Sequence, residues 1–97
     1  MPHVYMLRCS DGSLYVGSTG CLEQRVQEHH DGVGATYTSR RRPVELVWAE
    51  ERESVADAYG LEKQLQGWSR AKREALIRGD WDEIRRLARR RGRGGSR

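Results

Sequence analysis

A short polar turn between two β-prone segments constrains the fold of this chain more than any other feature of its sequence. Ser10-Asp11-Gly12-Ser13 separates segments 3–9 and 14–18, an arrangement typical of a β-hairpin. Because side chains alternate along a strand, the length of the loop decides which side chains share a face.

Two loop lengths fit this turn. A two-residue loop would place Tyr5 and Tyr15 on opposite faces of the hairpin. A three-residue loop over residues 10–12 sets Tyr15 opposite Leu7, so that both tyrosines share one face. This longer loop requires a left-handed backbone at its last position, which Gly12 adopts at little cost. We therefore predict the three-residue loop.

Hydrophobic periodicity and capping residues predict the other elements. A short helix covers residues 22–30, a third strand begins at residue 44, and residues 31–43 form a loop. Ser54 and Ser69 can each cap a helix, with the first running to about residue 68 and the second to residue 77. Asp80 opens a last helix through a capping box. The predicted fold class is α+β, a small three-stranded antiparallel sheet flanked by helices.

Basic charge is concentrated at the end of the chain. Residues 85–97 contain seven of the 18 basic residues and no acidic one, while residues 1–84 carry a net charge of −3. We predict one domain at 1–84 and a disordered basic tail at 85–97 that can bind phosphates, although a solubilising terminus is an equally good interpretation. Basic clusters within the domain also favour a nucleic-acid partner: Arg40, Arg41, Arg42, Arg70, Lys72 and Arg73.

The composition also limits the location of the protein. No segment approaches the ~18 apolar residues of a membrane span, and no signal-peptide pattern opens the chain. We predict a cytoplasmic protein with no membrane partner. Cys9 and Cys21 lack a metal-binding spacing and are predicted to be free thiols.

Three residues on the predicted helices have side chains suited to phosphate chemistry. Arg25 and His29 are four residues apart and therefore share one helix face. Arginine can grip a phosphate through two N–H groups, and histidine can position water or transfer a proton near neutral pH. Glu62 interrupts an apolar stripe formed by Val55, Ala58 and Leu65, and one carboxylate is enough for a Mg²⁺ ion that also binds waters and substrate phosphates.

Each of these residues also has a purely structural interpretation. Tyrosines in strands usually pack in the core, an Arg-His pair on a helix is usually solvated, and an isolated glutamate usually lies at the edge of a stripe. A functional site is favoured by the order and spacing of five residues together: Tyr5, Tyr15, Arg25, His29 and Glu62.

The same order and spacing resemble the GIY-YIG nuclease family. His3-Val4-Tyr5 stands at the position of that family's first tripeptide, and Tyr15-Val16-Gly17 at that of the second. The segment 22–29, with Arg25 and His29, is similar to the family's helix motif, and Glu62 to its metal-binding glutamate. Further features at 34–35, 42–43 and 68–70 are similar to those of short, stand-alone bacterial members. The resemblance covers residues 3–78.

The resemblance implies a specific activity. It implies metal-dependent cleavage of DNA, leaving a 5′-phosphate and a 3′-hydroxyl, with one Mg²⁺ or Mn²⁺ ion held by Glu62. A tyrosine would activate water, with Tyr5 and Tyr15 both candidates, and Arg25 would steady the phosphate. Some members carry an asparagine late in the domain, whereas this chain contains no asparagine.

The expected substrate is DNA recognised by its structure, with branched, nicked and single-stranded DNA as candidates. This chain has no separate DNA-binding domain, so a protein partner is a candidate source of specificity. Two alternatives remain: a non-catalytic nucleic-acid-binding module that retains the fold, and a subunit that cuts only together with a partner.

Overall fold

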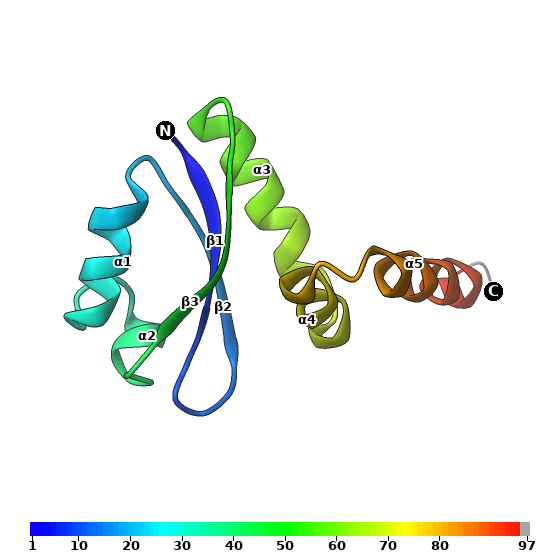
Figure 1. The fold of residues 1–97 in the computed structure, drawn as a ribbon, viewed down its shortest axis with the longest axis horizontal. Helices are drawn as coiled ribbons and strands as arrows, with labels where there is room; N and C mark the ends of the chain where they lie inside the picture. Colours follow the sequence, from blue (N-terminus) through cyan, green and yellow to red (C-terminus); the bar gives the residue numbers. More distant parts are fainter. Residues whose placement is uncertain (96–97) are drawn as a thin grey trace. The chain divides into compact units, whose positions relative to one another are not determined.

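The computed structural model describes the backbone of residues 1–95 and the side chains of residues 1–89 (Figure 1). Contacts divide the chain into two compact units, Met1–Gly67 and Trp68–Arg97. The first unit contains the whole sheet, and the second contains the last two helices. The domain boundary that the sequence predicts, between residues 84 and 85, stays a prediction.

The first two strands form the predicted hairpin. Strand β1 (His3–Arg8) pairs antiparallel with β2 (Leu14–Thr19), and Leu7 lies opposite Tyr15. Gly12 has a φ of 85°, and its N–H donates to the carbonyl of Cys9 at 2.9 Å. The three-residue loop is therefore confirmed, and with it the shared face of the two tyrosines.

The sheet has three strands in the order β2-β1-β3, so β1 is central. Strand β3 (Glu45–Glu51) pairs antiparallel with β1, and the pairing shifts between Met6 and Leu7. Across this shift, Val47 is the extra residue on β3, which interrupts the simple alternation of that strand. The central position of β1 explains why Val4 to Leu7 are at most 1% exposed.

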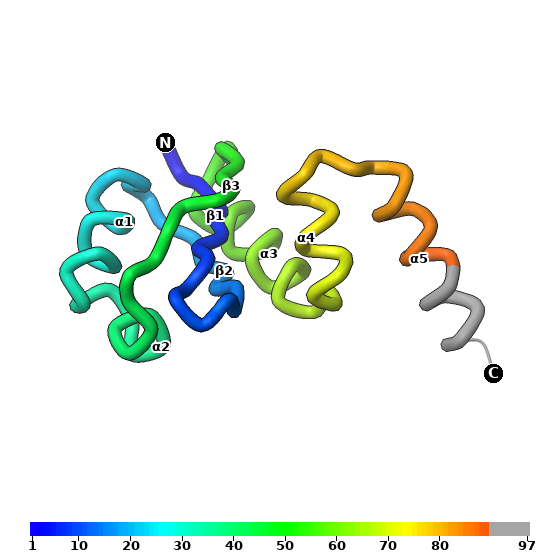
Figure 2. Tube along the Cα trace, turned by 60° about the horizontal axis from the view of Figure 1, so that its bottom comes forward, coloured from blue at the N-terminus to red at the C-terminus, as the bar shows by residue number. Residues whose placement is uncertain are grey.

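Helices lie on both faces of this sheet, as Figures 1 and 2 show from two directions. Helix α1 (Leu22–His30) and the one-turn helix α2 (Thr36–Ser39) lie on one side, and α3 (Val55–Gln66) packs on β1 and β2. This arrangement confirms the predicted α+β class.

Two local expectations on this unit were wrong. The predicted loop contains helix α2, whose residues carry no apolar periodicity that would reveal one turn of helix. Val55, predicted to belong to the apolar stripe of α3, is 65% exposed because it lies in the first turn. Ala58 and Leu65 of the same stripe are buried at 1% exposure each.

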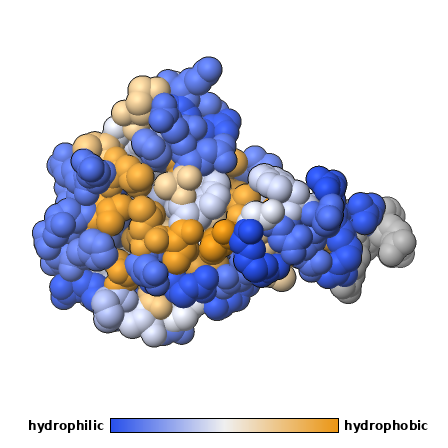
Figure 3. All heavy atoms as spheres, in the orientation of Figure 1, coloured by the Kyte–Doolittle hydropathy of each residue, from blue (hydrophilic) through white to orange (hydrophobic). Residues whose placement is uncertain are grey.

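The face of β1 toward α1 carries a core of four buried residues, with Tyr15 and Leu22 packed against it. The four are Tyr5, Leu7, Cys9 and Val44. Cys9 is buried and Cys21 is exposed, and both are free thiols as predicted. On the side of the molecule that Figure 3 turns to the viewer, apolar residues show at the middle and hydrophilic residues surround them.

The second unit consists of α4 (Arg70–Arg78) and α5 (Trp81–Gly95). Ser69 caps α4 through the N–H of Lys72, and Gly79 ends it with a φ of 72°, as predicted. Asp80 accepts from the N–H of Glu83 and so begins α5.

The last helix extends into the basic segment. The tail expected to be disordered over residues 85–97 is helical through Gly95, whereas residues 96–97 lie outside the described part of the chain. Ion pairs one turn apart, Arg85 with Asp82 and Arg86 with Glu83, favour helix at the start of this basic segment. The prediction of disorder considered only the positive charge of this segment and not its ion pairs with Asp82 and Glu83.

Candidate active site

A hydrogen bond between Tyr5 and His29 lies at the centre of the first unit. Tyr5 extends from the central strand toward α1, and its hydroxyl lies 2.8 Å from Nε2 of His29. The residues are 1% and 0% exposed, so water does not compete for this bond. The spacing of four residues on α1 places Arg25 one turn before His29, toward the same tyrosine.

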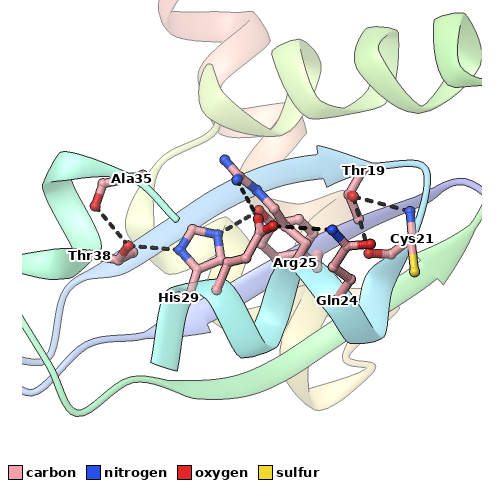
Figure 4. Close-up of polar contacts among 9 residues, drawn as sticks. Thr19, Cys21, Gln24, Arg25, His29, Ala35 and Thr38 are labelled. Carbon is pink, nitrogen blue, oxygen red and sulfur yellow. Dashed lines mark hydrogen bonds and ion pairs between the residues drawn. The ribbon is translucent and has the colours of Figure 1, made fainter. Parts of the chain in front are cut away.

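His29 has a second partner on its other ring nitrogen. Its Nδ1 lies 2.7 Å from the hydroxyl of Thr38, which in turn donates to the carbonyl of Ala35 at 3.2 Å. Figure 4 shows Thr38 and Ala35 on one side of the imidazole and Arg25 on the other. Gly34 closes the pocket around the ring, because a Cβ at that position would lie 2.7 Å from Nδ1.

Burial keeps both groups of the central pair neutral. Burial and, to a lesser degree, the charge of Arg25 lower the pKa of His29 from 6.5 to about 4. Burial raises the pKa of Tyr5 to about 12, although a hydrogen bond with Arg25 acts in the opposite direction. At neutral pH the site therefore contains a phenol and a neutral imidazole.

Arg25 connects this buried pair to the surface. Its side chain is 32% exposed and donates to Glu28 at 2.9 Å. The bond with Glu28 and, to a lesser degree, the bond with Tyr5 raise the pKa of the guanidinium, which is charged at every working pH. A fixed, partly exposed guanidinium of this kind can bind a phosphate group.

Tyr15 lies beside the central pair and is partly exposed. Its ring centroid is 5.2 Å from that of His29 and 6.4 Å from that of Tyr5. On its outer side it stacks with Tyr37 of α2, whose ring is covered by the guanidinium of Arg41 at 3.7 Å. Of the two tyrosines in the motif, Tyr15 is the one that solvent reaches.

Glu62 comes from α3. One carboxylate oxygen accepts from the hydroxyl of Ser18 at 2.5 Å, and the other accepts from the amide of Gln66 at 2.8 Å. Gln66 also donates to the carbonyl of Val16, so β2 and α3 together orient the carboxylate. The side chain is 14% exposed, and Lys63 lies 3.9 Å away. The charge of Glu62 also contributes to the raised pKa of Tyr5.

The structure thus brings four of the five predicted site residues into direct contact around Tyr5, all within Met1–Gly67. Glu62 is held separately, against the edge strand of the same sheet. No group of three or more His, Cys, Asp or Glu side chains is placed to hold a metal within the described part of the chain.

The predicted phosphate-binding residues have varied surroundings. Arg41 donates to Asp11 and to the carbonyl of Tyr37, and Arg42 donates to the carbonyls of Ser39 and His30. These contacts hold the α2 segment in place.

The basic residues of the second unit also contact neighbouring side chains or backbone. Arg70 pairs with Glu74, and the ammonium of Lys72 lies 4.3 Å from the ring of Trp68. Arg73 donates to the carbonyl of Trp68 at 3.0 Å. A role in nucleic-acid binding stays a prediction for all six residues.

Sequence reasoning missed Thr38, Ser18 and Gln66. The spacing of four residues between Glu62 and Gln66 could have indicated their contact. Neither Thr38 nor Ser18 has any such signal, because their partners lie nine and 44 residues away in the chain.

Comparison with known proteins agrees with this geometry. A model of the GIY-YIG catalytic domain matches residues 1–75. The chain belongs to the GIY-YIG family. A UPF0213 protein of Natronomonas pharaonis is 47% identical over 75 residues, which cover 77% of this chain and 88% of the relative. One from Staphylococcus saprophyticus is 40% identical, covering 77% and 92%.

A solved structure extends the similarity to the fold. The solution NMR structure of the UPF0213 protein BH0048 from Bacillus halodurans has a TM-score of 0.52 and 38% identity, covering 79% of this chain and 83% of the other. GIY-YIG proteins form a nuclease family whose members generally depend on a divalent metal and act on DNA. Among the described helices of this chain, none is long and apolar enough to cross a membrane.

Proposed function

We propose that this GIY-YIG protein is a metal-dependent endonuclease that hydrolyses phosphodiester bonds of DNA and selects its substrate by structure. One observation carries the proposal. A partly exposed arginine, Arg25, is fixed by Tyr5 and Glu28 next to a partly exposed tyrosine, with an oriented carboxylate on the same sheet. These are the groups that phosphodiester hydrolysis requires: a phosphate grip, a group that contacts water, and a metal ligand.

The surroundings of Glu62 fit a hard divalent cation. Its oxygens each accept one hydrogen bond from a neutral donor, so the carboxylate is oriented while its charge is retained. Mg²⁺ and Mn²⁺ would take the remaining ligands from water and from the phosphate of the substrate. When bound, the ion would stabilise negative charge that develops on the phosphate oxygens.

The residues around Tyr5 take separate roles in the proposal. Arg25 grips the phosphate, since it remains charged and faces solvent. Tyr15 contacts the attacking water, because it is partly exposed whereas Tyr5 is buried with its hydroxyl bonded to His29. His29 is fully buried, so it acts through Tyr5 and does not touch the substrate.

The basic side chains extend the phosphate contacts beyond the cleavage site. Arg40 and the α4 residues Arg70, Lys72 and Arg73 would bind backbone phosphates, which carry no sequence information. This is the basis for proposing selection by DNA structure, with a protein partner as an additional source of specificity.

A cleavage assay tests the proposal. Purified protein is incubated with branched, nicked, single-stranded and duplex DNA and with matched RNA, in Mg²⁺ or Mn²⁺ and in EDTA. We expect metal-dependent cleavage of at least one DNA structure, with 5′-phosphate ends. DNA binding without cleavage of any substrate would favour the non-catalytic module, and cleavage only after addition of a cell extract would favour the partner-dependent subunit.

A further inference from the structure

The hydroxyl of Thr38 belongs to a fully buried residue of the candidate site. It lies on the one-turn helix α2, at 0% exposure, between Nδ1 of His29 and the carbonyl of Ala35. A buried hydroxyl needs hydrogen-bond partners, and these are the two it has. Its position therefore links α2 to the ring that contacts Tyr5.

The two ends of this chain of hydrogen bonds fix its direction. A carbonyl only accepts, so the single proton of the Thr38 hydroxyl points to Ala35. The hydroxyl oxygen must then accept from Nδ1–H of His29. A neutral imidazole carries one proton, so Nε2 has a free lone pair and accepts from the hydroxyl of Tyr5.

The opposite end of the chain agrees with this direction. A guanidinium only donates, and Arg25 has a hydrogen bond with the Tyr5 hydroxyl. Tyr5 can accept from Arg25 only if its own proton points elsewhere, and His29 Nε2 takes it. Each group in this chain therefore donates to the next one, in the direction from Arg25 to Ala35.

The opposite tautomer of His29 is not compatible with this direction of hydrogen bonding. With the proton on Nε2, His29 would donate to Tyr5, whose oxygen would then be surrounded by donors from His29 and Arg25. The phenol proton would have no acceptor among these partners. The Thr38 oxygen would face a bare Nδ1 and would have to give up the bond to Ala35 in order to donate to it.

We propose that Thr38 is a positioning residue of the active site, which holds His29 in the Nδ1–H tautomer and thereby directs the lone pairs of Tyr5 toward Arg25. Its effect on cleavage rests on the proposed function, whereas its effect on the tautomer does not. The groups that face His29 are Tyr5 and Tyr15 from the strands, Arg25, Glu28 and His30 from α1, and Thr38 from α2.

Nitrogen NMR tests the tautomer without any assay of activity. Two-bond ¹H–¹⁵N correlations of labelled protein at pH 7 distinguish a protonated ring nitrogen from a bare one. We expect His29 to be protonated on Nδ1 in the parent and in Thr38→Ser, which keeps the hydroxyl. In Thr38→Val, of equal shape but without an acceptor, we expect a shift toward Nε2–H.

Two results would overturn the assignment. A parent protein with Nε2–H would contradict the direction of the whole chain, whatever the variants do. A folded Thr38→Val with an unchanged His29 tautomer would show that Thr38 does not control it. If Thr38→Val does not fold, the parent and Thr38→Ser still decide the direction.

Cleavage kinetics then test the consequence. Thr38→Val should lower kcat on the order of tenfold or more, the size of effect seen when the partner that orients a catalytic group is removed. DNA affinity in EDTA should change much less than kcat, because Glu28 still holds Arg25, and Thr38→Ser should restore kcat. Thr36→Val, an exposed threonine on the same helix, serves as the control and should cleave like the parent.

The outcomes separate this inference from the proposed function. A parent that cuts no substrate would refute the endonuclease, and the NMR result would still decide the tautomer. A parent that cuts, together with a Thr38→Val variant of altered tautomer that cuts equally fast, would refute the positioning role alone.

Discussion

Gly17 lies directly against the hydroxyl group of Tyr5, since a Cβ at this glycine would come within 2.5 Å of the tyrosine oxygen. Real Cβ atoms do not approach an oxygen so closely, so one of the two residues would have to move. The glycine of the Tyr15-Val16-Gly17 motif is therefore explained by the space that Tyr5 needs on the neighbouring strand.

This contact predicts the effect of Gly17→Ala. The added methyl group should push the Tyr5 hydroxyl away from His29 and weaken the buried 2.8 Å hydrogen bond between them. We expect the protein to lose about 1–3 kcal/mol of unfolding free energy, the usual cost of overpacking, and to lose most of its cleavage activity. Urea unfolding and the cleavage assay measure the two effects.

Gly20→Ala provides the matched control. Gly20 is three residues away, and nothing lies within 4 Å of a Cβ placed there. This variant should retain parental stability and cleavage. Equal losses in both variants would mean that any glycine replacement at the end of β2 is harmful and that the Tyr5 contact has no special role.

The buried imidazole predicts how stability depends on pH. His29 has a pKa of about 4 in the folded protein, below its ordinary value of 6.5, because burial disfavours the charged form. As the pH falls below about 6.5 the unfolded chain binds a proton that the folded protein refuses. The contribution of His29 to the unfolding free energy should therefore be constant above this pH and decline between about 6.5 and 4, by up to about 3 kcal/mol.

Urea unfolding at pH 7 and pH 4.5 measures this decline. Paired carboxylates such as Glu28 also lose stability in acid, so the parent alone is not decisive. His29→Gln should show a smaller difference between the two pH values, since glutamine does not titrate. His30→Gln removes the exposed neighbour and should behave like the parent. Equal pH dependence in the parent and His29→Gln would contradict the assignment.

The basic C-terminal segment predicts a salt effect on DNA binding. Deleting residues 90–97 removes four arginines and leaves Arg85 and Arg86, which pair with Asp82 and Glu83 in α5. If the segment binds phosphates, affinity should fall and the slope of log K against log salt should become shallower by about one unit per lost contact. Fluorescence anisotropy across a salt series measures the slope.

A charge-preserving variant shows what the segment contributes. Replacing the same four arginines by lysine keeps the charge and should keep the slope. A deletion with an unchanged slope would identify the segment as a solvated terminus. Cleavage at saturating DNA should survive the deletion, because no proposed site residue lies there.

The sequence contained enough information to predict the hairpin and to group Tyr5, Tyr15, Arg25 and His29, for physical reasons. Gly12 determines the loop and thus the face of Tyr5 and Tyr15, and a spacing of four residues unites Arg25 with His29. These are local rules. Thr38 could not be found in this way, since its importance comes from a contact across nine residues that depends on helix α2.

The roles of single residues were also harder to predict than their presence. His29 and Arg25 share a helix face, yet one is fully buried and the other has a side chain that is 32% exposed. Periodicity indicates which residues point in one direction but not how deep each one lies. For the basic segment after Ile84, net charge likewise does not show the ion pairs that support the start of the helix.

The last prediction distinguishes an enzyme from a binding module. Glu62→Gln keeps the shape of the side chain and can still contact Ser18 and Gln66, but it removes the charge that would hold the metal. Metal-dependent cleavage should fall about 100-fold or more, while DNA affinity in EDTA should stay level or rise, since a negative charge near the phosphates is lost. Arg25→Ala should lower both the cleavage rate and the DNA affinity, because arginine binds the phosphate in the ground state as well as in the transition state. Glu53→Gln is the control: it removes a negative charge from an exposed position and should leave cleavage and DNA affinity unchanged. Full cleavage by Glu62→Gln, in a preparation whose activity co-purifies with the protein, would show that the metal is held elsewhere and would overturn the proposed site.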